Sequence, residues 1–170
     1  LGYLFVVSVG LILVPMVFYP LFMLLMGTLA GRRFKRSFEE YPMVSVMVAA
    51  RNEEKCIAKR IRNLLEQDYP RNRYEILVAS DVSTDSTDSI VKSFSDERVR
   101  FFRSEERLGK SALMVKLSKM ARGEILVFTD ANTEFRSNTV RELVEPYADP
   151  RVGCVDGSKQ NSLNNVTCES

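Results

Sequence analysis

Asp130 and Asn132 stand one residue apart, shortly after the apolar run Ile125–Phe128. On a turn, residues at this spacing can point to the same side, so their oxygens could share one ligand. Carboxylate and amide oxygens suit Mg²⁺ or Mn²⁺, which usually completes its shell with phosphate oxygens and water. The pair therefore predicts a metal site that a diphosphate would complete. The alternative is that both residues cap the following segment.

Three other residues could bind parts of a nucleotide. Asp81 could accept hydrogen bonds from a base or ribose, unless it forms an Asx-type turn with the Ser/Thr-rich segment behind it. Lys110 could reach a phosphate, unless it is an ordinary solvated lysine. Arg51 could pair with a phosphate or simply lie at the edge of a sheet.

The segment RLGKSA, residues 107–112, matches half of a P-loop. The full pattern needs a glycine where Ser104 stands, and two glutamates in the same loop would repel phosphates. A membrane-anchored P-loop nucleotidase that uses Lys110 and Ser111 is therefore a minor alternative.

Predicted strands and helices alternate after Pro42, because short β-rich apolar runs are separated by stretches of helical periodicity. Strands are predicted at Met43–Ala50, Tyr74–Ala79, Val99–Phe102 and Ile125–Thr129, and a fifth is expected to start within Val152–Val155. Helices are predicted at Glu53–Gln67, Asp85–Phe94, Ser111–Met120 and Asn138–Tyr147. This order predicts right-handed βαβ units and a Rossmann-like, mostly parallel sheet with flanking helices.

The predicted strand ends carry the polar residues described above. In open parallel sheets, ligands bind beyond the carboxyl ends of the strands. We therefore expect Glu53, Asp81, Lys110 and Asp130 to lie along one rim of the sheet.

The first thirty residues contain no charged side chain. A helix of about 20 apolar residues crosses a bilayer, so this segment predicts an N-terminal transmembrane helix, which Pro15 and Pro20 could kink or break. A basic cluster follows it: Arg32, Arg33, Lys35 and Arg36. By the positive-inside rule, the cluster and everything after it should be cytoplasmic. We predict a transmembrane segment over residues 1–31, a basic linker over 32–42 and an α/β domain over 43–170.

Composition excludes several classes of function. The 170 residues include no histidine, which rules out Ser-His-Asp triads and histidine-ligated zinc. The net charge is +2, and without the basic cluster the acidic residues slightly outnumber the basic ones. Such a domain has no general attraction for nucleic acid.

Four segments occur in a specific order: VSVMVAARNEE, LLEQDYPRNRYEILVASDVSTDST, RLGKSALM and GEILVFTDANTEF. Together they resemble the N-terminal, donor-binding part of the family 2 glycosyltransferases, the processive and polyprenyl- or lipid-linked kind with a GT-A fold. The last segment is similar to the strand that ends in the family's metal-binding Asp-x-Asp. The resemblance extends over about residues 43–157.

The resemblance implies a role in binding a nucleotide sugar for Ala49, Ala50, Arg51, Glu53, Asp81, Lys110 and Asp130. The segment 49–53 would border the uracil or another base, and Asp81 would hold the base or the ribose. Lys110 would lie near the nucleotide, while Asp130 and Asn132 would flank Mg²⁺ or Mn²⁺ on the diphosphate.

The resemblance also implies an inverting, metal-assisted transfer from a nucleoside-diphosphate sugar, with a UDP-sugar favoured, to a glycan or lipid acceptor. The catalytic base is expected beyond Ser170, so no catalytic residue is assigned within the chain. Ser80, Val82 and Asn132 depart from the family's Asp, Gly and Asp. These departures leave open a catalytically impaired nucleotide-sugar-binding or scaffold protein of the same fold.

Overall fold

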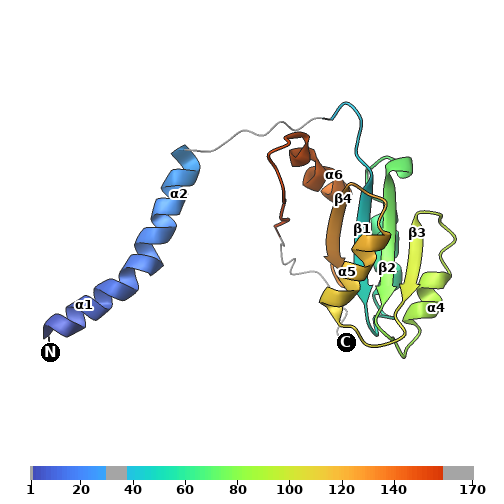
Figure 1. Cartoon of the computed structure of the whole chain (residues 1–170), viewed down its shortest axis with the longest axis horizontal. Coiled ribbons are helices and arrows are strands. Elements are labelled where there is room, and N and C mark those ends of the chain that lie inside the picture. Colours follow the sequence, from blue (N-terminus) through green and yellow to red (C-terminus); the bar gives the residue numbers. More distant parts are fainter. Residues whose placement is uncertain (1, 30–37, 159–170) are drawn as a thin grey trace. The chain divides into compact units, whose positions relative to one another are not determined.

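The computed structural model describes residues 2–29 and 38–158 (Figure 1). These residues fall into two compact units, an apolar helix and an α/β unit that contains every strand of the described chain. All of the predicted binding residues belong to the α/β unit. The predicted linker, residues 32–42, lies mostly outside the described residues.

The apolar helix runs without a break through α1 (Gly2–Leu13), the π-helical turn η1 (Val14–Phe18) and α2 (Tyr19–Leu29). The Tyr19 N–H donates to a carbonyl five residues earlier, which carries the helix past Pro15. A proline has no N–H, and a single π-turn accommodates it without ending the helix. The resulting 28-residue helix is long and apolar enough to cross a membrane.

Four parallel strands form the sheet of the α/β unit: β1 (Val44–Ala50), β2 (Tyr74–Ser80), β3 (Val99–Arg103) and β4 (Ile125–Asp130). Their order is β3-β2-β1-β4. Neighbouring strands are parallel, with Val44 opposite both Tyr74 and Ile125. The central strands are covered on both faces, which explains their almost continuous apolar sequence. The predicted Rossmann-like α/β fold is confirmed.

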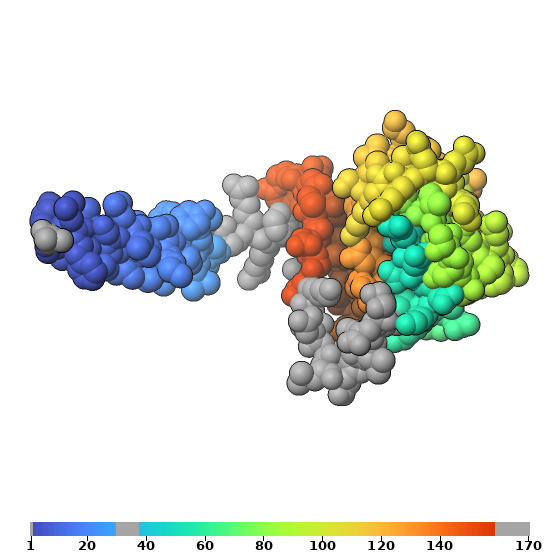
Figure 2. Space-filling view, turned by 90° about the horizontal axis from the view of Figure 1, so that it is seen from below, coloured from blue at the N-terminus to red at the C-terminus, as the bar shows by residue number. Residues whose placement is uncertain are grey.

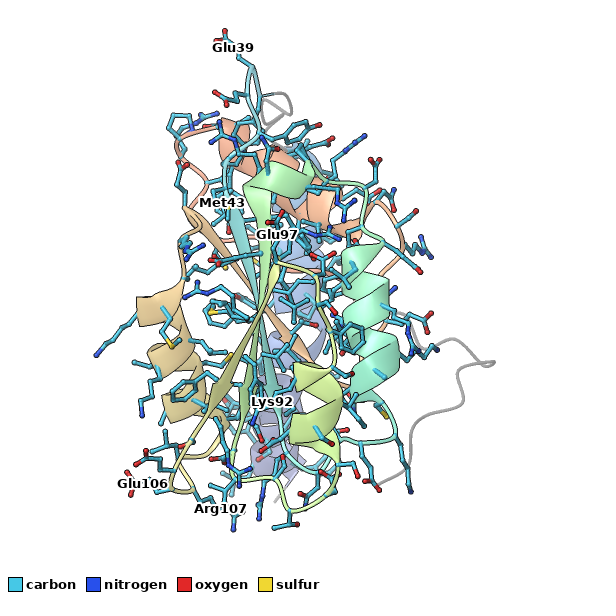
Figure 3. The ribbon with its side chains drawn as sticks, turned by 90° about the vertical axis from the view of Figure 1, so that its right-hand side faces the viewer. Glu39, Met43, Lys92, Glu97, Glu106 and Arg107 are labelled. Atoms are coloured by element: carbon cyan, nitrogen blue, oxygen red, sulfur yellow. The ribbon has the colours of Figure 1, made fainter. Side chains whose placement is uncertain are left out.

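Helices cover both faces of the sheet (Figure 3). One face packs against α3 (Ile57–Leu65), α4 (Thr87–Lys92) and α6 (Thr139–Val144), and the other packs against α5 (Lys110–Met120). Two short 3₁₀ helices complete the unit: η2 (Arg71–Arg73) and η3 (Glu145–Ala148).

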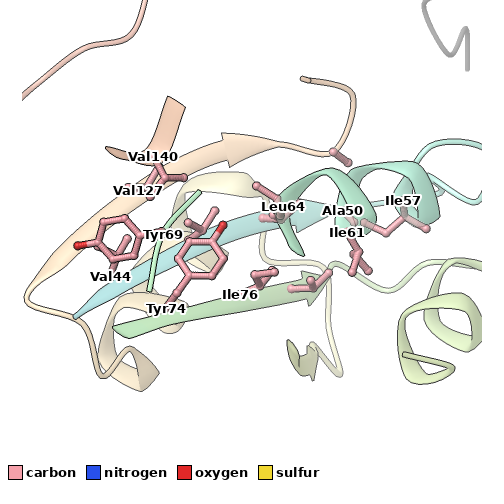
Figure 4. Close-up of a cluster of buried hydrophobic side chains, with 14 of the residues drawn as sticks. Val44, Ala50, Ile57, Ile61, Leu64, Tyr69, Tyr74, Ile76, Val127 and Val140 are labelled. Atoms are coloured by element: carbon pink, nitrogen blue, oxygen red, sulfur yellow. The ribbon is translucent and has the colours of Figure 1, made fainter. Parts of the chain in front are cut away.

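The side chains of β1 point alternately to the two faces of the sheet and contribute to two separate hydrophobic cores. Val44, Val46 and Val48 pack on the α3 side with Ile61 and other apolar residues of α3 (Figure 4). Met47 points to the opposite side and packs with apolar residues of β2 and α5. Because successive strand residues face opposite sides, one strand can serve both layers.

The strand β4 lies at the edge of the sheet and, within the described residues, pairs with β1 alone. The helix α5 packs over β1 and β2. Phe128 of β4 is therefore left 60% exposed.

The turn from α5 into β4 is tied to the amino-terminal end of the sheet. The Gly123 N–H donates to Ser45 Oγ at 2.8 Å, and Ser45 Oγ donates to Glu75 Oε1 at 2.6 Å. Burial alone would raise the pKa of Glu75, but hydrogen bonds from Ser45, the Arg122 N–H and Arg100 outweigh it and hold the pKa below its ordinary value. The buried carboxylate therefore stays charged and fixes the turn.

Two details of the predicted elements were wrong. No strand starts within Val152–Val155, because residues 152–158 are an unpaired coil whose apolar side chains are interrupted by exposed Gly153 and Cys154. The helix predicted from Glu53 begins only at Ile57, after a turn in which the Glu53 carbonyl accepts the Ile57 N–H.

Candidate functional site

A pocket of about 380 Å³ lies at the carboxyl ends of the strands. The chain changes direction across the sheet at β1, because β2 and β3 lie on one side of it and β4 on the other. Ligands of open parallel sheets bind at such a switch point. Figure 2 views the α/β unit from this end, where the segments that follow β1, β2 and β4 meet.

Every residue predicted to bind nucleotide or metal lines this pocket: Ala49, Ala50, Arg51, Glu53, Asp81, Lys110, Asp130 and Asn132. Arg107, Gly109 and Leu113 complete the lining. The structure thus brings the predicted residues together, while their roles in binding stay predictions. Sequence reasoning assigned no role to Arg107, although its position three residues before Lys110 could have indicated one.

Two loops interlock beside the pocket, residues 52–54 after β1 and residues 83–87 after β2. Asn52 Oδ1 accepts a hydrogen bond from the Thr84 N–H at 2.9 Å, and the Glu53 N–H donates to Thr87 Oγ1 at 2.8 Å. These cross-bonds fix the backbone that carries Glu53 at the pocket wall.

The Glu53 carboxyl group lies in an unfavourable electrostatic environment. Burial raises its pKa, and repulsion by Asp85 and Asp130 raises it further. Glu53, Asp81 and Asp130 give the pocket lining three carboxyl groups, from the carboxyl ends of three different strands. Such groups favour a cation or the hydrogen-bond donors of a nucleotide base.

The turn that follows β2 places Val82 at φ 55°, in the left-handed region. Asn52 adopts a similar φ of 53°, which asparagine tolerates better than most residues. A β-branched residue is strained in this conformation, whereas glycine adopts it freely.

Val82→Gly is therefore expected to stabilise the α/β unit by about 1 kcal/mol, the strain relieved less the added entropy of the unfolded chain. The check is the urea midpoint of the near-ultraviolet circular dichroism of the buried tyrosines. Val115→Gly is the matched control, because Val115 is equally β-branched but lies exposed within α5. It should destabilise, since glycine is a poor helix former. If Val82→Gly is no more stable than the parent, the left-handed conformation does not strain Val82.

Asp81 is buried and holds a distant turn. Its Oδ1 accepts the Leu108 N–H at 2.8 Å, and its Oδ2 accepts the Gly109 N–H at 3.0 Å. Its own N–H donates to the Ala50 carbonyl at 3.0 Å. The carboxylate therefore joins the end of β2 to the segment before α5, instead of closing an Asx-type turn with the residues behind it.

Asp130 is the last residue of β4, and Asn132 follows it in the turn that lines the pocket. The carboxylate of Asp130 is half-exposed and accepts a hydrogen bond from Lys110 Nζ. Neither residue caps the next helix, because α6 begins seven residues later, after Asn138. Their oxygens are thus available to a ligand that can replace the lysine.

Arg60 lies beneath this site, on the other face of the sheet, and is only 2% exposed. Its guanidinium donates to Thr129 Oγ1 at 2.6 Å and to Asn63 Oδ1 at 2.8 Å, and stacks 4.2 Å from the ring of Phe135. Burial lowers its pKa to about 10, which leaves it charged at neutral pH. A positive charge is therefore fixed behind Asp130. Sequence reasoning missed it, although the residue follows Ile57 by three positions on the buried stripe of α3.

The oxygens present fit a divalent cation only in part. Asp130 and Asn132 supply one carboxylate and one amide, and the described ranges contain no cluster of three acidic, histidine or cysteine side chains that could hold a metal. Mg²⁺ and Mn²⁺ commonly take one or two protein ligands and several phosphate oxygens. The donor set therefore fits an ion that arrives with, or is completed by, a diphosphate.

Comparisons with known proteins agree with this geometry. A sequence profile described as Glycosyl transferase family 2 matches residues 45–167. The beta-monoglucosyldiacylglycerol synthase of Nostoc sp. is 33% identical over 122 residues, which make up 69% of this chain and 26% of that protein. The chain thus spans about a quarter of the length of this relative. The family match argues against the P-loop nucleotidase.

Solved structures show the same fold. The mannosyltransferase PcManGT from Pyrobaculum calidifontis, in complex with GDP-Man and Mn²⁺, superposes with a TM-score of 0.75 at 28% identity, over 87% of this chain and 45% of that one. TarS of S. aureus, residues 1–349 in complex with UDP-GlcNAc, gives a TM-score of 0.54 at 30% identity, over 59% and 29% of the two chains. The GT-A fold predicted from the resemblance is confirmed.

Proposed function

Because the chain belongs to glycosyl transferase family 2, we propose that its pocket binds a nucleoside-diphosphate sugar, and that the protein transfers the sugar to a glycan or lipid acceptor. The observation that carries this proposal is the convergence of Glu53, Asp81, Lys110 and Asp130 on one pocket at the switch point of the sheet. The two solved relatives support it, since their structures were determined in complex with GDP-Man and with UDP-GlcNAc.

The positions of the residues around the pocket suggest which part of the donor each would contact. Residues 49–53 at the end of β1 and Asp81 at the end of β2 would contact the base and ribose. Lys110 and Asp130 would face the diphosphate, and Asn132 would share its cation with Asp130. A UDP-sugar remains the favoured donor, and Mg²⁺ or Mn²⁺ the favoured ion.

The charges of the pocket suit the departure of a nucleoside diphosphate. A cation held by Asp130 and Asn132 would supply positive charge that offsets the charge of the leaving diphosphate. Lys110 stands at the first position of α5, where the helix amino terminus also favours anions. Lys110 would exchange Asp130 for a phosphate oxygen and so add its ammonium charge to the leaving group.

We propose a single displacement with inversion at the anomeric carbon, in which the acceptor hydroxyl attacks opposite the diphosphate. The general base that takes the acceptor proton is proposed to be an acidic residue supplied by polypeptide beyond Ser170. The described pocket residues then bind and orient the donor, and none of them needs to remove that proton.

The apolar helix 2–29 is proposed to anchor the protein in a membrane, with the α/β unit on the cytoplasmic side. The helix is long and apolar enough to span, and the basic cluster that follows it in the sequence matches the cytoplasmic flank of such helices. An anchored enzyme would work close to lipid acceptors. The similarity to the beta-monoglucosyldiacylglycerol synthase of Nostoc sp. supports a lipid acceptor.

A donor panel tests the proposal directly. The chain in detergent is titrated by calorimetry with UDP-, GDP- and dTDP-sugars, with and without Mn²⁺. We expect one nucleotide class to bind, and to bind more tightly with the ion, because the protein supplies only part of its shell. If none of these donors binds, the proposal is wrong. Donor binding without any sugar transfer by the full-length protein would favour the catalytically impaired binding protein.

A further inference from the structure

We infer that Asp81 is a positioning residue: its carboxylate holds the turn of residues 107–110 across the pocket and so sets the place of Lys110 at the diphosphate end. This inference rests on the proposed function, and it changes the part assigned to Asp81. A residue that only held the base or the ribose would act at one end of the donor. A residue that also holds the turn affects both ends of the donor, the nucleoside and the diphosphate.

The carboxylate of Asp81 binds the backbone of the turn directly. Both oxygens of Asp81 accept backbone N–H groups, from Leu108 at 2.8 Å and from Gly109 at 3.0 Å. The residue is 6% exposed, so water competes weakly for these oxygens. Two charge-assisted hydrogen bonds from adjacent amides fix both the position and the orientation of the turn.

The turn connects the end of β2 with the end of β4. It starts beside the end of β2, where Asp81 stands, and ends in Lys110, whose ammonium group reaches Asp130 at the end of β4. Because β1 lies between β2 and β4, the turn and the Lys110 side chain together connect the two strand ends that flank β1. Figure 3 shows Glu106 and Arg107, labelled, at the end of the sheet where α5 begins.

The two attachments of the turn differ in strength. The Lys110 and Asp130 side chains are 62% and 49% exposed, and an exposed ion pair is easily replaced by an incoming phosphate or cation. The bonds to buried Asp81 have no such competitor. The turn therefore has a permanent attachment at β2 and an exchangeable one at β4, which lets Lys110 change partner while its backbone stays in place.

The variant Asp81→Asn, tested with two probes, distinguishes a residue that positions the turn from one that contacts only the base. The amide keeps one acceptor oxygen and replaces the other with an NH₂ group, so one of the two turn N–H groups loses its partner. The probes are the Mn²⁺ complex of pyrophosphate, which has no base, ribose or sugar, and the Mn²⁺ complex of UDP. Calorimetry on the full chain in detergent gives the dissociation constant of each.

The inference predicts that Asp81→Asn weakens pyrophosphate binding about tenfold, and UDP binding by at least the same factor. Weaker UDP binding with unchanged pyrophosphate binding would overturn it, because Asp81 would then contact only the nucleoside. Gly109→Ala supplies a second variant: Gly109 has φ 78°, so a side chain strains the turn while Asp81 stays intact. It should also weaken pyrophosphate binding. Glu97→Gln, a charge change at an exposed position outside the pocket, should leave both constants unchanged.

Trypsin sensitivity tests the attachment without any ligand. The turn contains two trypsin sites, after Arg107 and Lys110. Asp81→Asn should speed cleavage at both several-fold, whereas Glu97→Gln, far from both sites in the sequence, should not. Unchanged cleavage in Asp81→Asn would overturn the inference. If the parent chain binds neither probe but the variant is cleaved faster, the proposed function fails and the attachment of the turn stands.

Discussion

Replacing Asp130 with alanine is expected to abolish the metal-dependent part of nucleotide-sugar binding. Asp130 is the one carboxylate of the Asp130–Asn132 pair, and Asn132 alone leaves a single neutral oxygen. Loss of a ligating carboxylate should weaken metal-dependent binding by more than about 100-fold. Calorimetric titration of the favoured donor with and without Mn²⁺ measures it, and binding in the absence of the ion should change little.

Two further variants make the Asp130 test specific. Glu134→Ala removes an acid from the same loop that pairs with Lys59 outside the pocket, and it should retain the effect of Mn²⁺. Asn132→Asp adds a carboxylate and should strengthen the binding of the ion. The fold should survive Asp130→Ala, because an exposed ion pair with Lys110 contributes at most about 1 kcal/mol. An unchanged effect of Mn²⁺ in Asp130→Ala would remove this residue from the metal site.

Gly123→Ala is expected to destabilise the α/β unit by about 3 kcal/mol, at the upper end of the cost of inserting an atom into a packed site. A Cβ at this position would lie 2.5 Å from the Ser45 nitrogen and 2.8 Å from the Val44 carbonyl carbon. These are backbone atoms of the central strand, so they cannot rotate away as a flexible side chain would. The turn must move instead, which breaks its hydrogen bond to Ser45.

The same urea titration of the tyrosine signal measures this loss. Gly153→Ala is the matched control, because a Cβ there meets no atom within 4 Å, and its midpoint should stay near that of the parent. Binding provides a second contrast: the turn lies at the opposite end of the sheet from the pocket, so folded Gly123→Ala protein should still bind donor. A stability loss equal to that of Gly153→Ala would mean that the turn is not closely packed.

Much of the site could be predicted because it consists of strand ends. Each apolar run followed by polar residues is a local feature of the sequence, and a parallel sheet necessarily gathers its carboxyl ends at one edge. That reasoning placed Glu53, Asp81 and Asp130 at one rim, and the structure confirms the placement. The strand order, with β1 and β2 central, explains why almost all of their residues are buried, whereas most of those of β3 and β4 are partly exposed.

What could not be predicted depends on contacts between distant residues. Nothing near Asp81 in the sequence indicates that its carboxylate holds the turn at Leu108, 27 residues later. Arg60 was overlooked because a charge on a helix usually faces solvent, although its spacing from Ile57 puts it on the buried side. The expected strand near Val152 failed because an apolar run needs a neighbouring strand as well as suitable residues.

The open side of β4 has a practical consequence for handling the chain. Within residues 38–158, β4 pairs on one side alone and carries an exposed aromatic ring, so its outer edge offers a template on which strands of other molecules can align. In concentrated preparations, this rim is where copies would begin to aggregate. A lysine at position 128 would blunt that tendency without touching the opposite edge of the sheet or the interior.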